Sequence, residues 1–201
     1  MSEIASWNEA RLRSDVPANI DWMAFSRSLA DCVAHGLAYP VASYIIAQRD
    51  RLAETAVPLS ASTQLPLRDY FSTADLERIR IVRADPLPIP DPFFYPALRW
   101  FRLDLPEPSL TEAITFDDLI ASRDVMTPRL LFHELVHTVQ YRLLGVKRFA
   151  HLYVRGFLAG GGYDGIPLER VAFELDGRFG AGERPFSVEA EVRNWLSRGR
   201  Y

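Results

Sequence analysis

The sequence predicts an α+β fold that is mainly helical, on two observations. Several long segments carry apolar residues three and four positions apart, the spacing that gathers them on one face of an α-helix. Only short runs, at 79–84 and 113–116, have the length and composition of β-strands. We expect a single domain over residues 1–201, with an N-terminal helical extension at 1–70 and a core with a small β-sheet at 71–201.

The N-terminal part predicts one long amphipathic helix that begins near Asp21. Its apolar residues recur at helical intervals, at Trp22, Phe25, Leu29, Val33 and Leu37. We expect Pro40 to kink or break this helix, because proline lacks a backbone N–H and clashes with the preceding turn. The helix then resumes and leads into a connection rich in Pro, Ser and Thr over 56–70.

The middle of the chain predicts short elements. Ser72 or Thr73 can cap a short helical turn, and residues 79–84 alternate between apolar and charged in the manner of a half-buried strand. Closely spaced prolines exclude regular structure directly beyond that strand. The aromatic run at 93–101 is expected to pack into the core.

The strongest helix prediction runs from Thr127 to Gly145. Thr127 is a suitable N-cap, Pro128 fits the first helical position, and Gly145 is a natural C-terminal stop. The residues between are apolar almost all round, which predicts a central, buried helix. Further helices are expected directly after Gly145, from Pro167, and after a cap at Ser187.

Within the central helix, His133, Glu134 and His137 form the pattern H-E-x-x-H. Residues four apart share one face of a helix, so both imidazoles can bind one metal ion with the carboxylate beside them. Burying these polar groups costs free energy unless a metal or other partners compensate. The competing interpretation is two histidines satisfied within the core and a glutamate at the surface.

The run LLFHELVHTVQ, residues 130–140, resembles the active-site helix of the zincin metallopeptidases. The resemblance covers 127–145 and, more loosely, the C-terminal half of the chain. It implies that His133 and His137 bind Zn²⁺ and that Glu134 is the general base that activates a water. It also implies a zincin-like core over 71–201.

Zincins carry a small sheet against this helix, and its edge strand can hold an extended peptide. Either 113–116 or 119–122 could be that edge.

A catalytic zinc normally takes three protein ligands, so a third ligand is needed. The metzincin spacing is excluded, because Gln140 and Leu143 occupy the positions of its Gly and third His. His151 is possible but lacks that spacing. The resemblance to glutamate zincins implies a Glu on a later helix, and either Glu169 or Glu174 fits this description.

Glu169 and Glu174 lie five apart, so they cannot both face one metal. Basic residues flank Glu174 four positions away on either side, as on a solvated face, whereas Glu169 borders an apolar stripe. We therefore favour Glu169. Asp176, two turns after Glu169, could accept a hydrogen bond from a ligand imidazole. In the glutamate zincins, the acidic residue with this role usually lies four positions after the ligand, and Phe173 occupies that position here.

The expected function is that of a zinc-dependent hydrolase, a metallopeptidase that acts on a peptide or amide bond of a peptide or protein substrate. Candidate donors to the oxyanion of the reaction are Tyr153, Arg155 and Tyr163. The alternative is a zinc-binding domain of zincin-like fold that has a scaffold or binding role and no catalysis. A purely structural helical protein, in which the motif is a coincidence, would bind no metal.

Composition limits the partners. The 23 Lys and Arg nearly balance the 26 Asp and Glu, which indicates no nucleic-acid partner and no polybasic membrane patch. We find neither a membrane-spanning apolar run nor the apolar core of a signal peptide. Cys32, the only cysteine, excludes an intrachain disulfide and is expected to be a small core residue. We therefore expect a cytoplasmic protein.

Overall fold

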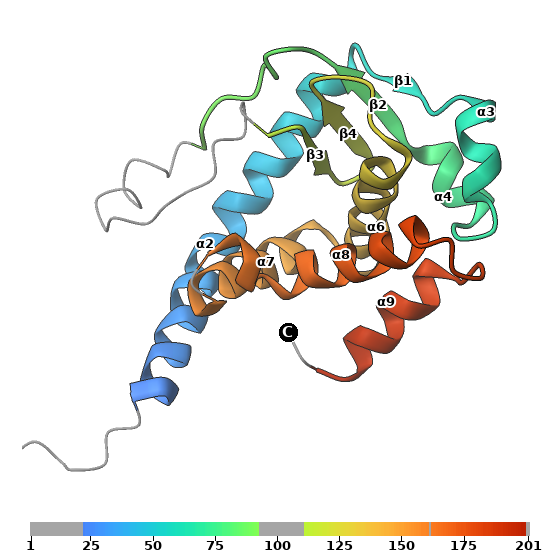
Figure 1. Cartoon of the computed structure of the whole chain (residues 1–201). Helices are drawn as coiled ribbons and strands as arrows, with labels where there is room; N and C mark the ends of the chain where they lie inside the picture. The colour runs from blue at the N-terminus through green and yellow to red at the C-terminus, as the bar shows by residue number, and fades with distance from the viewer. Residues whose placement is uncertain (1–21, 93–110, 161, 200–201) are drawn as a thin grey trace, which may run out of the picture.

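Helices dominate the fold, as predicted. The computed structural model describes residues 22–92, 111–160 and 162–199, and within them seven α-helices accompany one small mixed sheet (Figure 1). The fold is therefore α+β and mainly helical. The helices are α2 (Trp22–Ala53), α3 (Ala61–Gln64), α4 (Thr73–Arg78), α6 (Pro128–Leu144), α7 (Val146–Gly160), α8 (Pro167–Gly180) and α9 (Val188–Ser197).

The sheet has four strands in the order β1-β2-β4-β3. The two inner strands, β2 and β4, are parallel, and each outer strand is antiparallel to its neighbour. This order settles which segment is the edge near the central helix: β3 lies at the edge and contacts α6, whereas β4 is interior and buried at all four residues. The strands are β1 (Val57–Pro58), β2 (Arg80–Arg83), β3 (Ala113–Phe116) and β4 (Leu119–Ser122).

Helix α6 begins and ends where the sequence predicts. The N–H of Leu130 donates to the Thr127 hydroxyl over 3.1 Å, and Gly145 ends the helix with a φ of 73° that glycine adopts without strain. Every residue from Leu131 to Tyr141 is buried. The helix is therefore central, and its polar side chains must find partners inside the protein.

Two hydrophobic clusters meet at α6. One gathers side chains of α6, α8, α9 and the α4 region, and in it Phe132 stacks on Phe179 with ring centroids 4.4 Å apart. The other joins α2 and α7 to the sheet, and in it Tyr141 stacks on Phe149 at 3.7 Å. Because α6 contributes to both clusters, its position is fixed from two sides.

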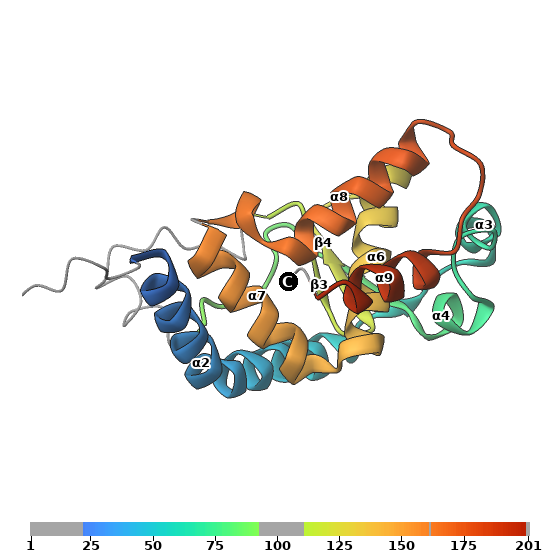
Figure 2. The same cartoon turned by 90° about the horizontal axis from the view of Figure 1, so that it is seen from below.

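Helix α2 is continuous through Pro40, so the proline does not break it, which was one of the two expected effects. Its buried face differs from the prediction, because it carries alanines rather than Val33 and Leu37, which are half-buried. Small side chains let this helix lie close along α7, and the two run side by side in Figures 1 and 2. The buried alanines are Ala30, Ala34, Ala38 and Ala42.

The structure bears on three further expectations, and a fourth concerns residues outside the described ranges. Cys32 is exposed, contrary to the prediction, because it projects away from the alanine face. The connection at 56–70 contains structure that its composition did not indicate: β1, α3 and a 3₁₀ turn at Leu65–Leu67. The aromatic run at 93–101 lies outside the described residues. The cap at Ser72 is confirmed, since its hydroxyl accepts from the N–H of Asp75.

Within the described residues, no helix has the length and apolar character needed to cross a membrane.

Candidate metal centre

The structure brings three of the predicted ligands together. The Nε2 atoms of His133 and His137 lie 3.1 Å apart on α6, and each lies 3.3 Å from Oε2 of Glu169 on α8. All three side chains are buried. Within the described part of the chain, this is the one group of three or more His, Cys, Asp or Glu side chains that is close enough to hold a metal ion.

Glycines in the chain reversal before α8 allow Glu169 to reach this position. A Cβ on Gly156 of α7 would lie 2.5 Å from the Pro167 ring, at the first residue of α8. Gly160 and Gly165 also approach so closely that a Cβ on Gly165 would lie 2.4 Å from the Gly160 backbone. Larger residues at these sites would push the start of α8, and Glu169 with it, away from α6.

Each candidate histidine ligand directs Nε2 at Glu169 and donates its Nδ1–H to an acceptor. His133 Nδ1 lies 2.8 Å from Oδ2 of Asp176, and His137 Nδ1 lies 2.9 Å from Oε1 of Gln140. The orientation of the Gln140 amide is fixed, because its Nε2 donates to the Leu168 carbonyl over 3.0 Å. In the form that binds a metal, both Nδ1 atoms are protonated and both imidazoles are neutral, so each directs an Nε2 lone pair at Glu169; without a metal, a proton on Nε2 makes a hydrogen bond to Glu169 instead.

The site therefore joins three acceptors, which need a cation between them. Zinc binds His nitrogens and carboxylate oxygens at roughly 2.0–2.2 Å, so tetrahedral ligand atoms lie roughly 3.3–3.6 Å apart. The two separations of 3.3 Å reach the lower end of that range, and the third, 3.1 Å between the two Nε2 atoms, is slightly shorter. Two histidines and one carboxylate are also a known ligand set of catalytic zinc, which leaves a fourth position for water. The residues present fit zinc.

The electrostatics of the group agree with a cation site. Burial lowers the pKa of His137, but the carboxylates of Glu169 and Glu134 outweigh it and raise that pKa to about 9. Burial opposes ionisation of Glu169, yet His137 and the hydrogen bonds from His133, His137 and Tyr163 hold its pKa well below the usual range. A proton and a metal ion therefore compete for the same acceptors.

Glu134, the predicted base, lies at the sheet side of the site. Its Oε2 accepts a hydrogen bond from the Thr115 hydroxyl of β3 over 2.6 Å. The side chain is buried, and its charge is close enough to His137 to raise the pKa of that imidazole. The prediction of an exposed glutamate, made by the competing interpretation, is wrong.

Two of the three candidate oxyanion donors reach the site. The Tyr163 hydroxyl donates to Glu169 Oε2 over 2.7 Å, and Tyr153 also hydrogen-bonds Glu169. Arg155 does not reach it, because its guanidinium pairs with Asp31 on α2. Burial raises the pKa of both tyrosine hydroxyls, which therefore stay protonated and can donate.

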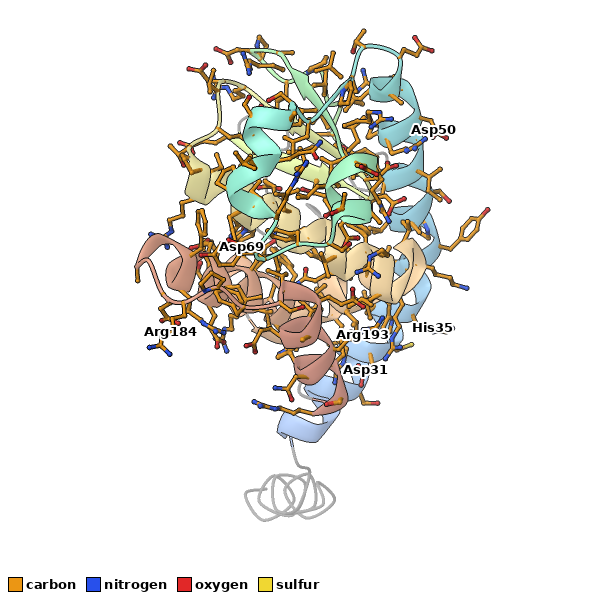
Figure 3. The ribbon with its side chains drawn as sticks, turned by 90° about the vertical axis from the view of Figure 1, so that its right-hand side faces the viewer. Asp31, His35, Asp50, Asp69, Arg184 and Arg193 are labelled. Atoms are coloured by element: carbon orange, nitrogen blue, oxygen red, sulfur yellow. The ribbon has the colours of Figure 1, made fainter. Side chains whose placement is uncertain are left out.

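The other ligand candidates lie elsewhere. Glu174 is exposed on α8. One of the basic residues that flank it, Arg178, pairs with Glu183 and Glu191. His151 packs edge-on to His35, with ring centroids 6.2 Å apart, and His35 is an exposed residue of α2 (Figure 3).

Four residues near the centre escaped the sequence analysis. Gln140 follows His137 by three positions. Arg129, which donates to Asp176 over 2.7 Å, precedes His133 by four positions. Both lie at helical spacing from a candidate ligand, so this spacing could have indicated them. Phe173, with its ring centroid 4.6 Å from that of His133, was noted only as a departure from the family pattern. Thr115 reaches the site from a strand, and no local spacing indicates that contact.

Comparison of the chain with family models, with curated proteins and with solved structures finds no match.

Proposed function

We propose that the chain is a zinc-dependent hydrolase, a metallopeptidase that cleaves a peptide or amide bond. The observation that carries the proposal is the convergence of His133, His137 and Glu169 at separations close to those between the ligands of a tetrahedral zinc. A second observation supports catalysis rather than storage of the metal. Glu134, which such a site needs as a base, is buried beside the ligands and has no part in binding the metal.

Bound zinc would supply an acidified water and a Lewis-acid contact for the substrate carbonyl. Glu134 would be the group that holds the proton released when a water adds to the carbonyl carbon. Glu134 then gives the proton to the nitrogen of the scissile bond as the carbon–nitrogen bond breaks. The carboxylate returns to its starting state, so protons and electrons balance over the cycle.

The protein offers hydrogen-bond donors for the oxygen that gains charge in this reaction. Tyr163 is the better placed, because the residue is 41 % exposed and its hydroxyl lies beside the centre, where it would turn its one proton from Glu169 to the substrate oxygen. A hydroxyl that donates to the developing oxyanion stabilises the transition state. Tyr153 is deeper in the protein and is assigned to holding Glu169.

A peptide is the proposed substrate because of the edge strand. β3 lies against α6 at the edge of the sheet, and an edge strand can pair with an extended backbone.

We also propose a cytoplasmic location. The single cysteine supports it, since a chain with one cysteine has no intrachain disulfide for an oxidising compartment to form.

Glu134→Gln tests the proposal against the alternative of a zinc-binding scaffold. Wild type and variant, each loaded with zinc, are incubated with a mixture of peptides, and the products are identified by mass spectrometry. We expect the variant to keep its zinc and to lose about 10²–10⁴-fold in cleavage rate, the contribution of a general base. Glu174→Gln, at an exposed position of α8, is the matched control. If Glu134→Gln cleaves as fast as wild type, catalysis by this site is refuted and the alternative of a zinc-binding scaffold remains.

A further inference from the structure

Thr115 of β3 is bound to the side chain of the proposed base. Its Oγ1 lies 2.6 Å from Oε2 of Glu134, and it also lies 3.3 Å from the Glu134 carbonyl oxygen. The two residues are 7 % and 5 % exposed. A hydrogen bond of this length to a carboxylate is charge-assisted, and burial strengthens it further.

Each of the four polar side chains at the centre has a hydrogen-bonding partner outside the set. The pairs are His133 with Asp176, His137 with Gln140, Glu169 with Tyr163, and Glu134 with Thr115. Three of these partners come from helices or from the turn before α8. Among the described residues, Thr115 is the partner that comes from the sheet, so this pair fixes the base relative to the edge strand.

From this geometry we infer that Thr115 is the positioning residue of Glu134, an inference that rests on the proposed function. A glutamate side chain has several rotatable bonds, and a base must lie within roughly 2.6–3.2 Å of the proton it takes. The Thr115 hydroxyl holds Oε2 against β3. The other carboxylate oxygen, Oε1, is thereby kept in one place to take and return the proton.

The backbone of Thr115 is held independently of its hydroxyl. Residue 115 pairs with Ile120 in the β3–β4 ladder, and its carbonyl accepts a hydrogen bond from the Tyr141 hydroxyl at 3.4 Å. Removal of the side-chain hydroxyl therefore leaves the strand in its place beside α6. This separates a positioning role from a purely structural one.

The test uses two substitutions at this position and one control. Thr115→Val keeps the shape and removes the hydroxyl, whereas Thr115→Ser keeps the hydroxyl and removes a methyl group. Thr138→Val is the matched control, because Thr138 is a buried threonine of α6 whose hydroxyl donates to the Leu135 carbonyl of the same helix. Thermal unfolding confirms that each full-length variant is folded.

Steady-state kinetics use zinc-loaded protein and a peptide that the wild type cleaves. We expect Thr115→Val to lower kcat by about ten- to hundredfold, the usual effect of losing the partner of a functional group, with KM unchanged. Thr115→Ser should recover most of kcat, and Thr138→Val should keep it. The zinc affinity of all three should equal that of the wild type, because Thr115 touches none of the three ligands.

A crystal structure of zinc-loaded Thr115→Val gives a readout other than activity. We expect the Glu134 carboxylate to occupy more than one orientation in the variant and a single one in the wild type. Wild-type kcat and a single Glu134 orientation in Thr115→Val would overturn the positioning role while the proposed function stands. If the wild type cleaves no peptide, or Glu134→Gln cleaves as fast as wild type, the proposed function fails and the inference fails with it.

Discussion

His133 Nδ1 lies 2.8 Å from the carboxylate of Asp176, which places a buried negative charge behind one of the candidate zinc ligands. The hydrogen bond fixes the ring so that Nε2 faces Glu169, and it makes the imidazole a better donor to a metal. Asp176 follows Glu169 by seven positions, two turns along α8, so one helix supplies both a ligand and the group that orients another ligand.

Asp176→Ala should weaken zinc binding by about 10–100-fold, because it leaves His133 free to rotate. The affinity can be measured by competition with a chromophoric chelator. Arg129→Ala is the control, since Arg129 pairs with Asp176 but its side chain is 60 % exposed, and an exposed pair contributes little. We expect Arg129→Ala to stay within about fivefold of wild type. Equal losses in the two variants would contradict the role assigned to Asp176.

Gln140→Leu should lower both stability and zinc affinity. The amide joins His137 to the Leu168 carbonyl inside the protein, and Gln140 has no exposed surface. Its loss leaves the buried Nδ1–H of His137 without an acceptor, at a cost of about 1–3 kcal/mol, and the Leu168 carbonyl keeps only its bond within α8. Urea unfolding measures the change.

Gln140→Glu separates the two contacts of the amide, because a carboxylate still accepts from His137 and cannot donate to Leu168. It should retain more zinc affinity than Gln140→Leu. The opposite order would show that the contact with His137 is unimportant.

Zinc binding should strengthen as the pH rises toward 9. The raised pKa of His137, about 9, means that this imidazole carries a proton at pH 7 that zinc must displace. Below the pKa, the apparent affinity should fall about tenfold per pH unit, and above it this dependence should disappear. Calorimetry in buffers of different ionisation enthalpy should detect about one proton released per zinc at pH 7. If zinc binding releases no proton at pH 7, the raised pKa of His137 or its role as a zinc ligand is wrong.

Gly165→Ala should destabilise the protein and displace Glu169. The added Cβ would lie 2.4 Å from the Gly160 backbone, and overpacking of this kind costs about 1–3 kcal/mol. Gly177→Ala is the matched control, because nothing lies within 4 Å of a Cβ at that position inside α8. There the change should stabilise by about 0.5–1 kcal/mol, the helix preference for alanine. Thermal unfolding measures the stability of both variants, and zinc titration measures whether Gly165→Ala weakens zinc binding while Gly177→Ala does not.

Much of the helical part of this fold was predictable because its information is local. The cap at Thr127, the stop at Gly145 and the apolar residues between them specify α6 within a single stretch of sequence. The preference for Glu169 over Glu174 also came from the surroundings of each residue along one helix. The structure places Glu169 at the centre, buried beside His133 and His137, and leaves Glu174 exposed.

The predictions failed where the structure depends on a contact between segments that are distant in the sequence. The alanine face of α2 contacts α7, and only the closeness of that contact makes alanine preferable to the larger Val33 and Leu37. β1 exists because it pairs with β2, and its two residues carry no periodicity of their own. The contact of Thr115 with Glu134 joins a strand to a helix 19 positions later, a relation that no pattern of spacing contains.

The proposed hydrolase depends on a zinc ion held by His133, His137 and Glu169. Its most direct test is the metal content of protein purified without added metal, measured by mass spectrometry for wild type, Glu169→Gln and Glu174→Gln. We expect about one zinc per chain in wild type and in Glu174→Gln, and a loss of zinc in Glu169→Gln, because three protein ligands are needed to hold a catalytic zinc. Well-folded wild type that contains no zinc, even after zinc is supplied, would contradict the metal centre and the hydrolase proposed from it.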